Sequence, residues 1–250
     1  MPADTLHTYF PLALGLAFFL AAALYASVGH GGASAYLAVM GLLGMAPTEM
    51  KPIALTLNIA VSLLAWIAFT RAGHFRPRLF WPLAVASVPA ALLGGWLQSP
   101  EPVFKLILAA ALIAGAWRLV CGCKADEATL REPYQPALLL LGLAIGFLSG
   151  LIGIGGGIFL TPMLVLWRWS PAKPAAAISA AFIFVNSLAG LTGFLSTGRS
   201  VPPLAWLLLP AVLAGGWIGS HWGSRRAGSP ALLRVLAAVL VVAAAKFVIP

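Results

Sequence analysis

Gly150-Leu151-Ile152-Gly153-Ile154-Gly155-Gly156-Gly157-Ile158 is a run of glycines inside an otherwise apolar stretch of the chain. A second, weaker copy lies upstream, at Val28-Gly29-His30-Gly31-Gly32-Ala33-Ser34. The two copies are 124 residues apart, since 153 − 29 and 156 − 32 give the same interval. Glycine allows a backbone at membrane depth to leave the helix, and the freed N–H groups must then pair with protein, water or a ligand. We therefore expect a binding site at these glycines.

The composition places the chain in a lipid bilayer. Its 250 residues are 61% hydrophobic and 8% charged, and the mean hydropathy of +0.99 excludes a soluble globule with a polar surface. The formal net charge of +9 does not indicate nucleic acid, because the basic residues lie in short connections between apolar segments, where they set orientation. We expect a multi-pass integral protein of the bacterial cytoplasmic (inner) membrane, with lipid as its surroundings.

Apolar segments bounded by Pro, Gly and charged residues form two sets of five. They span residues 8–28, 34–45, 53–70, 79–98 and 103–120, and then 137–152, 158–168, 175–196, 203–221 and 231–249. Segments of about 20 residues cross a bilayer core of roughly 30 Å, whereas the segments of about 11 residues after each glycine run reach only about half way. We predict an N-terminal transmembrane repeat over 1–120, a cytoplasmic linker over 121–136 and a C-terminal transmembrane repeat over 137–250.

The two halves resemble one another beyond the glycines. Pro89-Ala90-Ala91-Leu92-Leu93-Gly94-Gly95-Trp96 matches Pro210-Ala211-Val212-Leu213-Ala214-Gly215-Gly216-Trp217, and looser matches pair Lys51 with Lys173 and Asn58 with Asn186. Because five segments are an odd number, the second half enters the membrane from the opposite side, which makes the repeat inverted.

The distribution of basic residues agrees with this topology when the N-terminus lies outside. Eleven Lys and Arg residues then fall inside and four fall outside, as the positive-inside rule requires. The inside set is Arg71, Arg76, Arg78, Arg118, Lys124, Arg131, Arg168, Lys173, Arg225, Arg226 and Arg234, and the outside set is Lys51, Lys105, Arg199 and Lys246. The predicted fold is an all-α polytopic membrane protein with two inverted repeats of about five membrane-inserted helices each and glycine-broken helical hairpins.

Inverted-repeat membrane proteins are typically secondary transporters, whose sites lie near the bilayer midplane where broken helices of the two halves meet. The N–H groups at residues 31–33 and 155–157 would lie at the start of the short helices and could bind an anion. The alternative is that the glycines serve only close helix packing, as in G-x-x-x-G pairs.

A few polar residues at membrane depth complete the candidate site. The amides of Asn58 and Asn186 could donate to an oxyanion or to a neighbouring helix, and the hydroxyls of Ser34 and Thr161 more simply bond back to their own helices. His30 could bind a proton together with the anion, or could be a satisfied structural histidine. No Asp or Glu lies in an apolar segment, and the isolated pair Cys121 and Cys123 does not indicate a metal site. We expect neither a metal nor another cofactor.

The glycine pattern Gly150-x-x-Gly153-x-Gly155-Gly156-Gly157-x-x-x-x-Pro162, its weaker first copy and the Pro-x-x-x-x-Gly-Gly-Trp element of each half resemble the sulfite exporter family TauE/SafE. The resemblance covers nearly all of the chain. It implies a transporter, an exporter by family name, of small sulfur-containing oxyanions such as sulfite, thiosulfate or organosulfonates. The candidate substrate-binding residues are Gly29, His30, Gly31, Gly32, Ser34, Asn58, Gly153, Gly155, Gly156, Gly157, Thr161 and Asn186, with His30 coupling transport to protons.

Two other classes of protein remain open from the residues alone. A membrane-embedded enzyme would need a nucleophile and base, or metal ligands, at membrane depth, and His30 with Ser34 is a weak pair for that purpose. A membrane scaffold or assembly protein would need no transport path. Substrate-dependent flux in proteoliposomes separates these classes, since only a transporter produces it. We expect a transporter that is not an enzyme.

Overall fold

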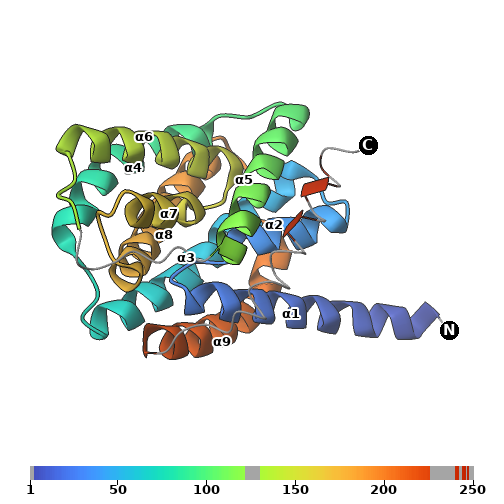
Figure 1. Cartoon of the computed structure of the whole chain (residues 1–250). Coiled ribbons are helices and arrows are strands. Elements are labelled where there is room, and N and C mark those ends of the chain that lie inside the picture. The colour runs from blue at the N-terminus through green and yellow to red at the C-terminus, as the bar shows by residue number, and fades with distance from the viewer. Residues whose placement is uncertain (1–2, 122–129, 226–239, 242–243, 246, 248–250) are drawn as a thin grey trace.

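The computed structural model describes residues 3–121, 130–225, 240–241, 244–245 and 247, and this part of the chain is helical with no strand (Figure 1). The first half contains α1 (Ala3–Ser27), α2 (Ala33–Leu42), α3 (Pro47–Arg71), α4 (Pro77–Trp96) and α5 (Glu101–Cys121). The second half contains α6 (Gln135–Ile152), α7 (Gly157–Leu166), α8 (Ala172–Leu195) and α9 (Pro203–Arg225). Most of the predicted last segment, 231–249, and residues 122–129 of the predicted linker lie outside the described residues.

The helices differ in whether they can cross a bilayer. Five of the described helices, α3, α4, α6, α8 and α9, are long and apolar enough to do so. The short helices α2 and α7 have 10 residues each and therefore reach about 15 Å, which is half of a bilayer core. Helix α3 begins at Pro47 and not near residue 53 as the sequence predicted, because Pro47 occupies the first turn, where a missing N–H group is tolerated, while Pro52 lies inside the helix.

The packing of the helices occurs in matched pairs. The most extensive contacts join α4 to α6 and α1 to α9, while α3 and α8 cross between these pairs (Figure 1). Three further contacts have counterparts: α3 with α9 and α4 with α8, α2 with α3 and α7 with α8, α1 with α3 and α6 with α8. The contact of α1 with α2 is an exception, because α6 and α7 make no comparable contact within the described residues.

Two seams of small residues join the halves. Gly142, Gly146 and Gly150 of α6 face the backbone of α4 so closely that an added Cβ would collide with a carbonyl oxygen of α4 at each position. Glycines of α9 meet the carbonyls of α1 in the same way. These contacts are Gly215 with Phe19, Gly219 with Ala23 and Gly223 with Ser27. Glycine at every fourth position allows two helices to pack backbone to backbone in a membrane.

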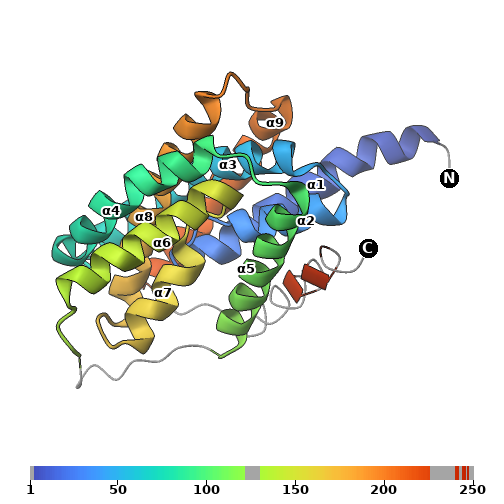
Figure 2. The same cartoon turned by 90° about the horizontal axis from the view of Figure 1, so that it is seen from above.

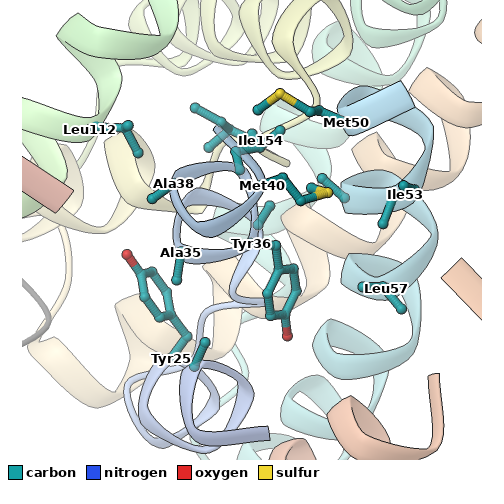
Figure 3. Packing of buried hydrophobic residues seen from close by; sticks show 14 of the residues in the cluster. Tyr25, Ala35, Tyr36, Ala38, Met40, Met50, Ile53, Leu57, Leu112 and Ile154 are labelled. Carbon is teal, nitrogen blue, oxygen red and sulfur yellow. The ribbon is translucent and has the colours of Figure 1, made fainter. Parts of the chain in front are cut away.

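The outer surface and the interior of the bundle are both apolar. Large hydrophobic side chains such as Leu106, Leu140 and Leu207 are more than 60% exposed, which suits a surface covered by lipid. Inside, α2 is surrounded by a buried cluster in which Tyr36 lies on the side facing Ile53 and Leu57 of α3 (Figure 3). Viewed from above, the N-terminal part of α1 projects beyond the rest of the bundle (Figure 2).

Candidate functional site

The first glycine loop connects α1 to α2. Gly29 and Gly32 have φ angles of 77° and 96°, a region that L-residues with a side chain rarely adopt. A Cβ on Gly29 would lie 2.5 Å from the carbonyl oxygen of Ala176 on α8, so the loop also contacts the second half directly. Gly32 is the N-cap of α2, and it provides no side-chain cap for the N–H groups of that helix.

The second glycine loop connects α6 to α7 and has a similar form. Gly153, Gly155 and Gly156 have φ angles of 82°, 79° and 82°. Gly156 is the uncapped N-cap of α7, and a Cβ added to it would lie 2.7 Å from Ile145 Cγ2 and 2.8 Å from Phe182 Cε1. Both short helices therefore begin at a left-handed glycine that is enclosed by packed side chains.

Asn58 joins the two loops. Its Oδ1 accepts a hydrogen bond of 3.3 Å from the N–H of Ala33, at the start of α2. Its Nδ2 donates to the carbonyl oxygen of Ile154 in the second loop and to Ser187 Oγ of α8, at 3.2 Å each. The side chain is fully buried, so one amide from α3 holds both loops and α8 in one arrangement. This amide is thus engaged by protein groups in the described conformation.

His30 makes the second connection between the loops. The buried ring has Nδ1 2.9 Å from the Val28 carbonyl oxygen and Nε2 3.0 Å from the carbonyl oxygen of Gly157, the first residue of α7. Thr161 Oγ1 lies 3.4 Å from Nε2. A carbonyl only accepts hydrogen bonds, and imidazole donates from one nitrogen when neutral and from both when protonated. The number of hydrogen bonds between the ring and these carbonyls therefore depends on the protonation of His30.

Several backbone N–H groups of the two glycine loops form no hydrogen bond within the described residues. Within the part of the chain that the structure describes, the N–H groups of Gly31, Gly32, Gly155, Gly156 and Gly157 donate to no protein acceptor. An added Cβ on Gly31 would collide with Asn58 Oδ1 and one on Gly155 with Asn58 Nδ2, which places one glycine of each loop beside the same amide. Buried backbone N–H groups are almost always paired, so these five require an explanation.

The remaining predicted residues take different roles. The expectation that Ser34 and Thr161 bond back to their own helices is wrong, because the Ser34 hydroxyl donates to Tyr25 Oη at 2.9 Å and that of Thr161 to Ser179 Oγ at 2.7 Å. Tertiary packing supplies each hydroxyl with a partner on another helix. Asn186 Nδ2 donates to the Phe182 carbonyl oxygen at 2.8 Å within α8, while its Oδ1 is buried without a partner.

The sequence interpretation missed the role of Lys51, which it counted among exposed loop charges. Lys51 lies in the second turn of α3 and is only 6% exposed. Its Nζ donates to the carbonyl oxygens of Gly95 at 3.0 Å, Gly94 at 3.2 Å and Leu97 at 3.4 Å, at the C-terminal end of α4. Pro47, ahead of the lysine, was the available signal, because proline favours the first position of a helix and therefore predicts a helix start before Lys51.

Five of the described helices are apolar and long enough to span a bilayer. The two glycine loops, 28–32 and 153–156, together with Asn58 and His30, form a buried polar site between these helices, the glycine junction. These features define a polytopic membrane protein with an internal polar site. Comparison with known proteins gives the family. The description "Sulfite exporter TauE/SafE" belongs to the family that matches residues 14–247, and the chain is a member of that family of membrane transporters. No solved structure shows a significant similarity to the chain.

Relatives of the chain carry transporter names without a substrate. "Probable membrane transporter protein y4hK" of Sinorhizobium fredii is 37% identical over 240 residues, which is 94% of this chain and 97% of the relative. "Probable membrane transporter protein YjnA" of Bacillus subtilis is 25% identical over 90% of this chain and 95% of its own length. "Probable membrane transporter protein YunE" of the same organism is 30% identical over 43% of this chain and 40% of its own length.

Proposed function

We propose that this protein is a secondary transporter that exports small sulfur-containing oxyanions, such as sulfite, thiosulfate or organosulfonates, from the bacterial cytoplasm. The family description supports the substrate class, and the donor-rich junction supports an anion. Among the described residues, no Asp or Glu is buried, so the junction lacks the carboxylates that would bind a cation.

The observation that carries the proposal is the set of five N–H groups in the two glycine loops that have no acceptor among the described residues. Backbone N–H groups at a helix N-terminus bind anions, because they donate directly and lie at the positive end of the helix dipole. Helices α2 and α7 both begin at an uncapped glycine, one from each half. A small oxyanion between the two loops would accept hydrogen bonds from both.

Alternating access is the mechanism that this arrangement supports. In the described conformation the loops are buried and joined through Asn58 and His30, which corresponds to a closed state. Opening to either side would separate the first loop from the second and break the bonds from Asn58 to Ile154 and from His30 to Gly157. The anion would replace those bonds when it binds.

An inverted repeat is the topology that would give such a transporter its two openings. The matched helix contacts support a twofold relation between 1–120 and 137–250, and the odd number of segments per half supports inversion. Arginines that the topology assigns to the inside also lie together. Arg76, Arg78 and Arg131 line one hollow of about 640 Å³, and Arg71 lines another with Arg225. Single cysteines at residues 76 and 225, with Cys121 and Cys123 replaced by serine, should both be labelled from the cytoplasm. Labelling from opposite sides would exclude the inverted repeat.

His30 is the residue that would couple transport to protons. A bound anion favours imidazolium, while burial without an anion favours neutral imidazole, so the proton and the anion should bind together.

Flux into proteoliposomes tests the proposed function. Purified protein should move radiolabelled sulfite, thiosulfate or an organosulfonate across the bilayer, whereas protein-free vesicles and vesicles with Gly156→Val should not. Absence of flux for every one of these anions, with protein that is folded and inserted, would overturn the proposal and favour a scaffold.

A further inference from the structure

Two basic side chains from opposite halves meet at one pocket outside the glycine junction. The pocket has a volume of about 70 Å³, and its lining includes Lys51 from α3 and Arg199 from the connection between α8 and α9. Gly95, Phe104 and Leu151 bring α4, α5 and α6 to its wall. A volume of this size holds several water molecules or one small polyatomic ion.

Lys51 forms the buried end of the pocket. Its stem packs against the second glycine loop, since a Cβ on Gly153 would lie 3.3 Å from Lys51 Cγ and 3.2 Å from its carbonyl oxygen. Its ammonium group is held by three carbonyl oxygens at the end of α4 and by no carboxylate among the described residues. Carbonyl dipoles orient the ammonium group but do not cancel its charge.

Arg199 is partly exposed at the other end of the pocket, and Phe194 connects the two cations. The Arg199 guanidinium carbon lies 5.7 Å from the centroid of the Phe194 ring, and Lys51 Nζ lies 5.9 Å from the same centroid. Both distances are within the range of cation–π attraction. The aromatic ring thereby holds two like charges near one another.

The described residues that line the pocket include no Asp or Glu to balance this pair. Glu101, at the start of α5, is paired with Lys105 at 2.7 Å on the exposed surface. Two positive charges in a small hollow concentrate a positive potential, which attracts anions and raises their local concentration. A cationic site without its own counter-ion is suited to an anionic ligand.

The position of the pocket connects it to the glycine junction. Lys51 lies near the start of α3 and Arg71 at its end, so the two are separated by about 30 Å along the helix, the thickness of a bilayer core. The topology predicted from the basic residues places Lys51 and Arg199 on the outer side of the membrane. Lys51 also packs beside Gly153 of the second loop. The pocket thus lies between the outer surface and the glycine junction.

We propose that Lys51 and Arg199 form a separate oxyanion-binding site at the outer mouth of the protein, where the anion pauses between the glycine junction and the outside. This inference rests on the proposed function, since it assigns a second position on the path of the same anion. Arg199 captures the anion through its guanidinium group, and Lys51 attracts it toward Gly153.

The test compares Arg199→Gln with Lys105→Gln, because both variants remove one positive charge from the side assigned as outer. Lys105 is paired with Glu101 and does not line the pocket, so it is a matched control. Thiosulfate and sulfite flux should be measured in proteoliposomes with the anion supplied first at the outer face and then at the inner face. For Arg199→Gln we expect the apparent KM at the outer face to rise about fivefold or more, with kcat and the inner-face KM nearly unchanged.

The outcomes separate the two proposals. An unchanged outer KM for Arg199→Gln, an equal rise in Lys105→Gln, or a fall in kcat alone would overturn the outer site while leaving the transporter intact. Absence of flux in the unaltered protein would instead overturn the proposed function, and the outer site with it. Arg199→Lys adds a second variant that keeps the positive charge on a partly exposed side chain, and its outer KM should rise less than that of Arg199→Gln.

Discussion

Asn58 lies inside α3 and Asn186 inside α8, the third described helix of each half, yet the hydrogen bonds of the two side chains differ. Asn58 bonds to the first glycine loop, to the second loop and to α8, whereas the amide of Asn186 bonds back to Phe182 in its own helix and leaves its oxygen unpaired. The lysines differ as well, since Lys51 is buried against α4 and Lys173 is exposed. The two side chains that connect the glycine loops, Asn58 and His30, thus both come from the first half.

The largest effect is expected from Gly156→Val, which tests whether transport requires a residue without a side chain at this position of the second loop. Gly156 has a φ of 82°, and its side-chain position is filled by Ile145 and Phe182. Valine there would distort the loop and block approach to its N–H groups, so transport should fall below detection. The flux assay in proteoliposomes measures this loss.

Gly73→Val is the control for that substitution. Gly73 has a φ of 80° but nothing lies within 4 Å of the position of its Cβ. The variant therefore carries the same backbone strain without the collision, and it should retain transport. Normal transport by Gly156→Val would place the site away from the second loop.

The next largest effect should come from Asn58→Ala, compared with Asn186→Ala. Asn58→Ala removes three hydrogen bonds and leaves the two buried loops joined through His30, so flux should fall at least tenfold and stability should decrease by about 1–3 kcal/mol. Asn186→Ala removes one local hydrogen bond together with an unpaired oxygen, and its cost in thermal unfolding should be smaller. Equal losses in the two variants would contradict the asymmetry of the halves.

A change in pH dependence, rather than in maximal rate, is expected from His30→Gln. In the unaltered protein, flux should decrease as pH rises through about 5 to 8, because neutral imidazole no longer binds a proton with the anion. Glutamine keeps a donor near Gly157 but does not titrate, so the profile should flatten. If the variant keeps the original pH profile, His30 is structural and the proton is carried elsewhere.

The smallest effect is expected from replacing Lys51 or Lys173 with glutamine, measured as the temperature of unfolding of the protein in detergent. Lys51→Gln should lower the temperature of unfolding, since three carbonyl oxygens at the end of α4 lose their shared donor. Lys173→Gln should leave it unchanged within error, because that side chain is exposed. A similar shift in both variants would show that the burial of Lys51 does not contribute to stability.

The sequence predicted those features that depend on local chemistry. Hydrophobic segments and glycine runs gave the membrane class, and the short helices after the glycines begin within one residue of the expected positions. Partners across helices could not be predicted, because the connection of Ser34 to Tyr25 or of Asn58 to Ile154 depends on how α1, α3 and α6 pack. The spacing of Gly142, Gly146 and Gly150 did carry a readable signal of close packing, which the interpretation applied only to the glycine run.

The glycine seams also determine which parts of the molecule can move as one body. Each seam fastens the first helix of one half to the fourth helix of the other, α6 to α4 and α1 to α9, through backbone contact that leaves no side chains to rearrange. We therefore expect two rigid bodies, one containing α4 and α6 and the other α1 and α9, so that each contains helices of both halves. The first glycine loop follows α1 and the second follows α6, so the loops belong to different bodies. A disulfide that fastens α4 to α6 should then leave transport intact, and so should one that fastens α1 to α9.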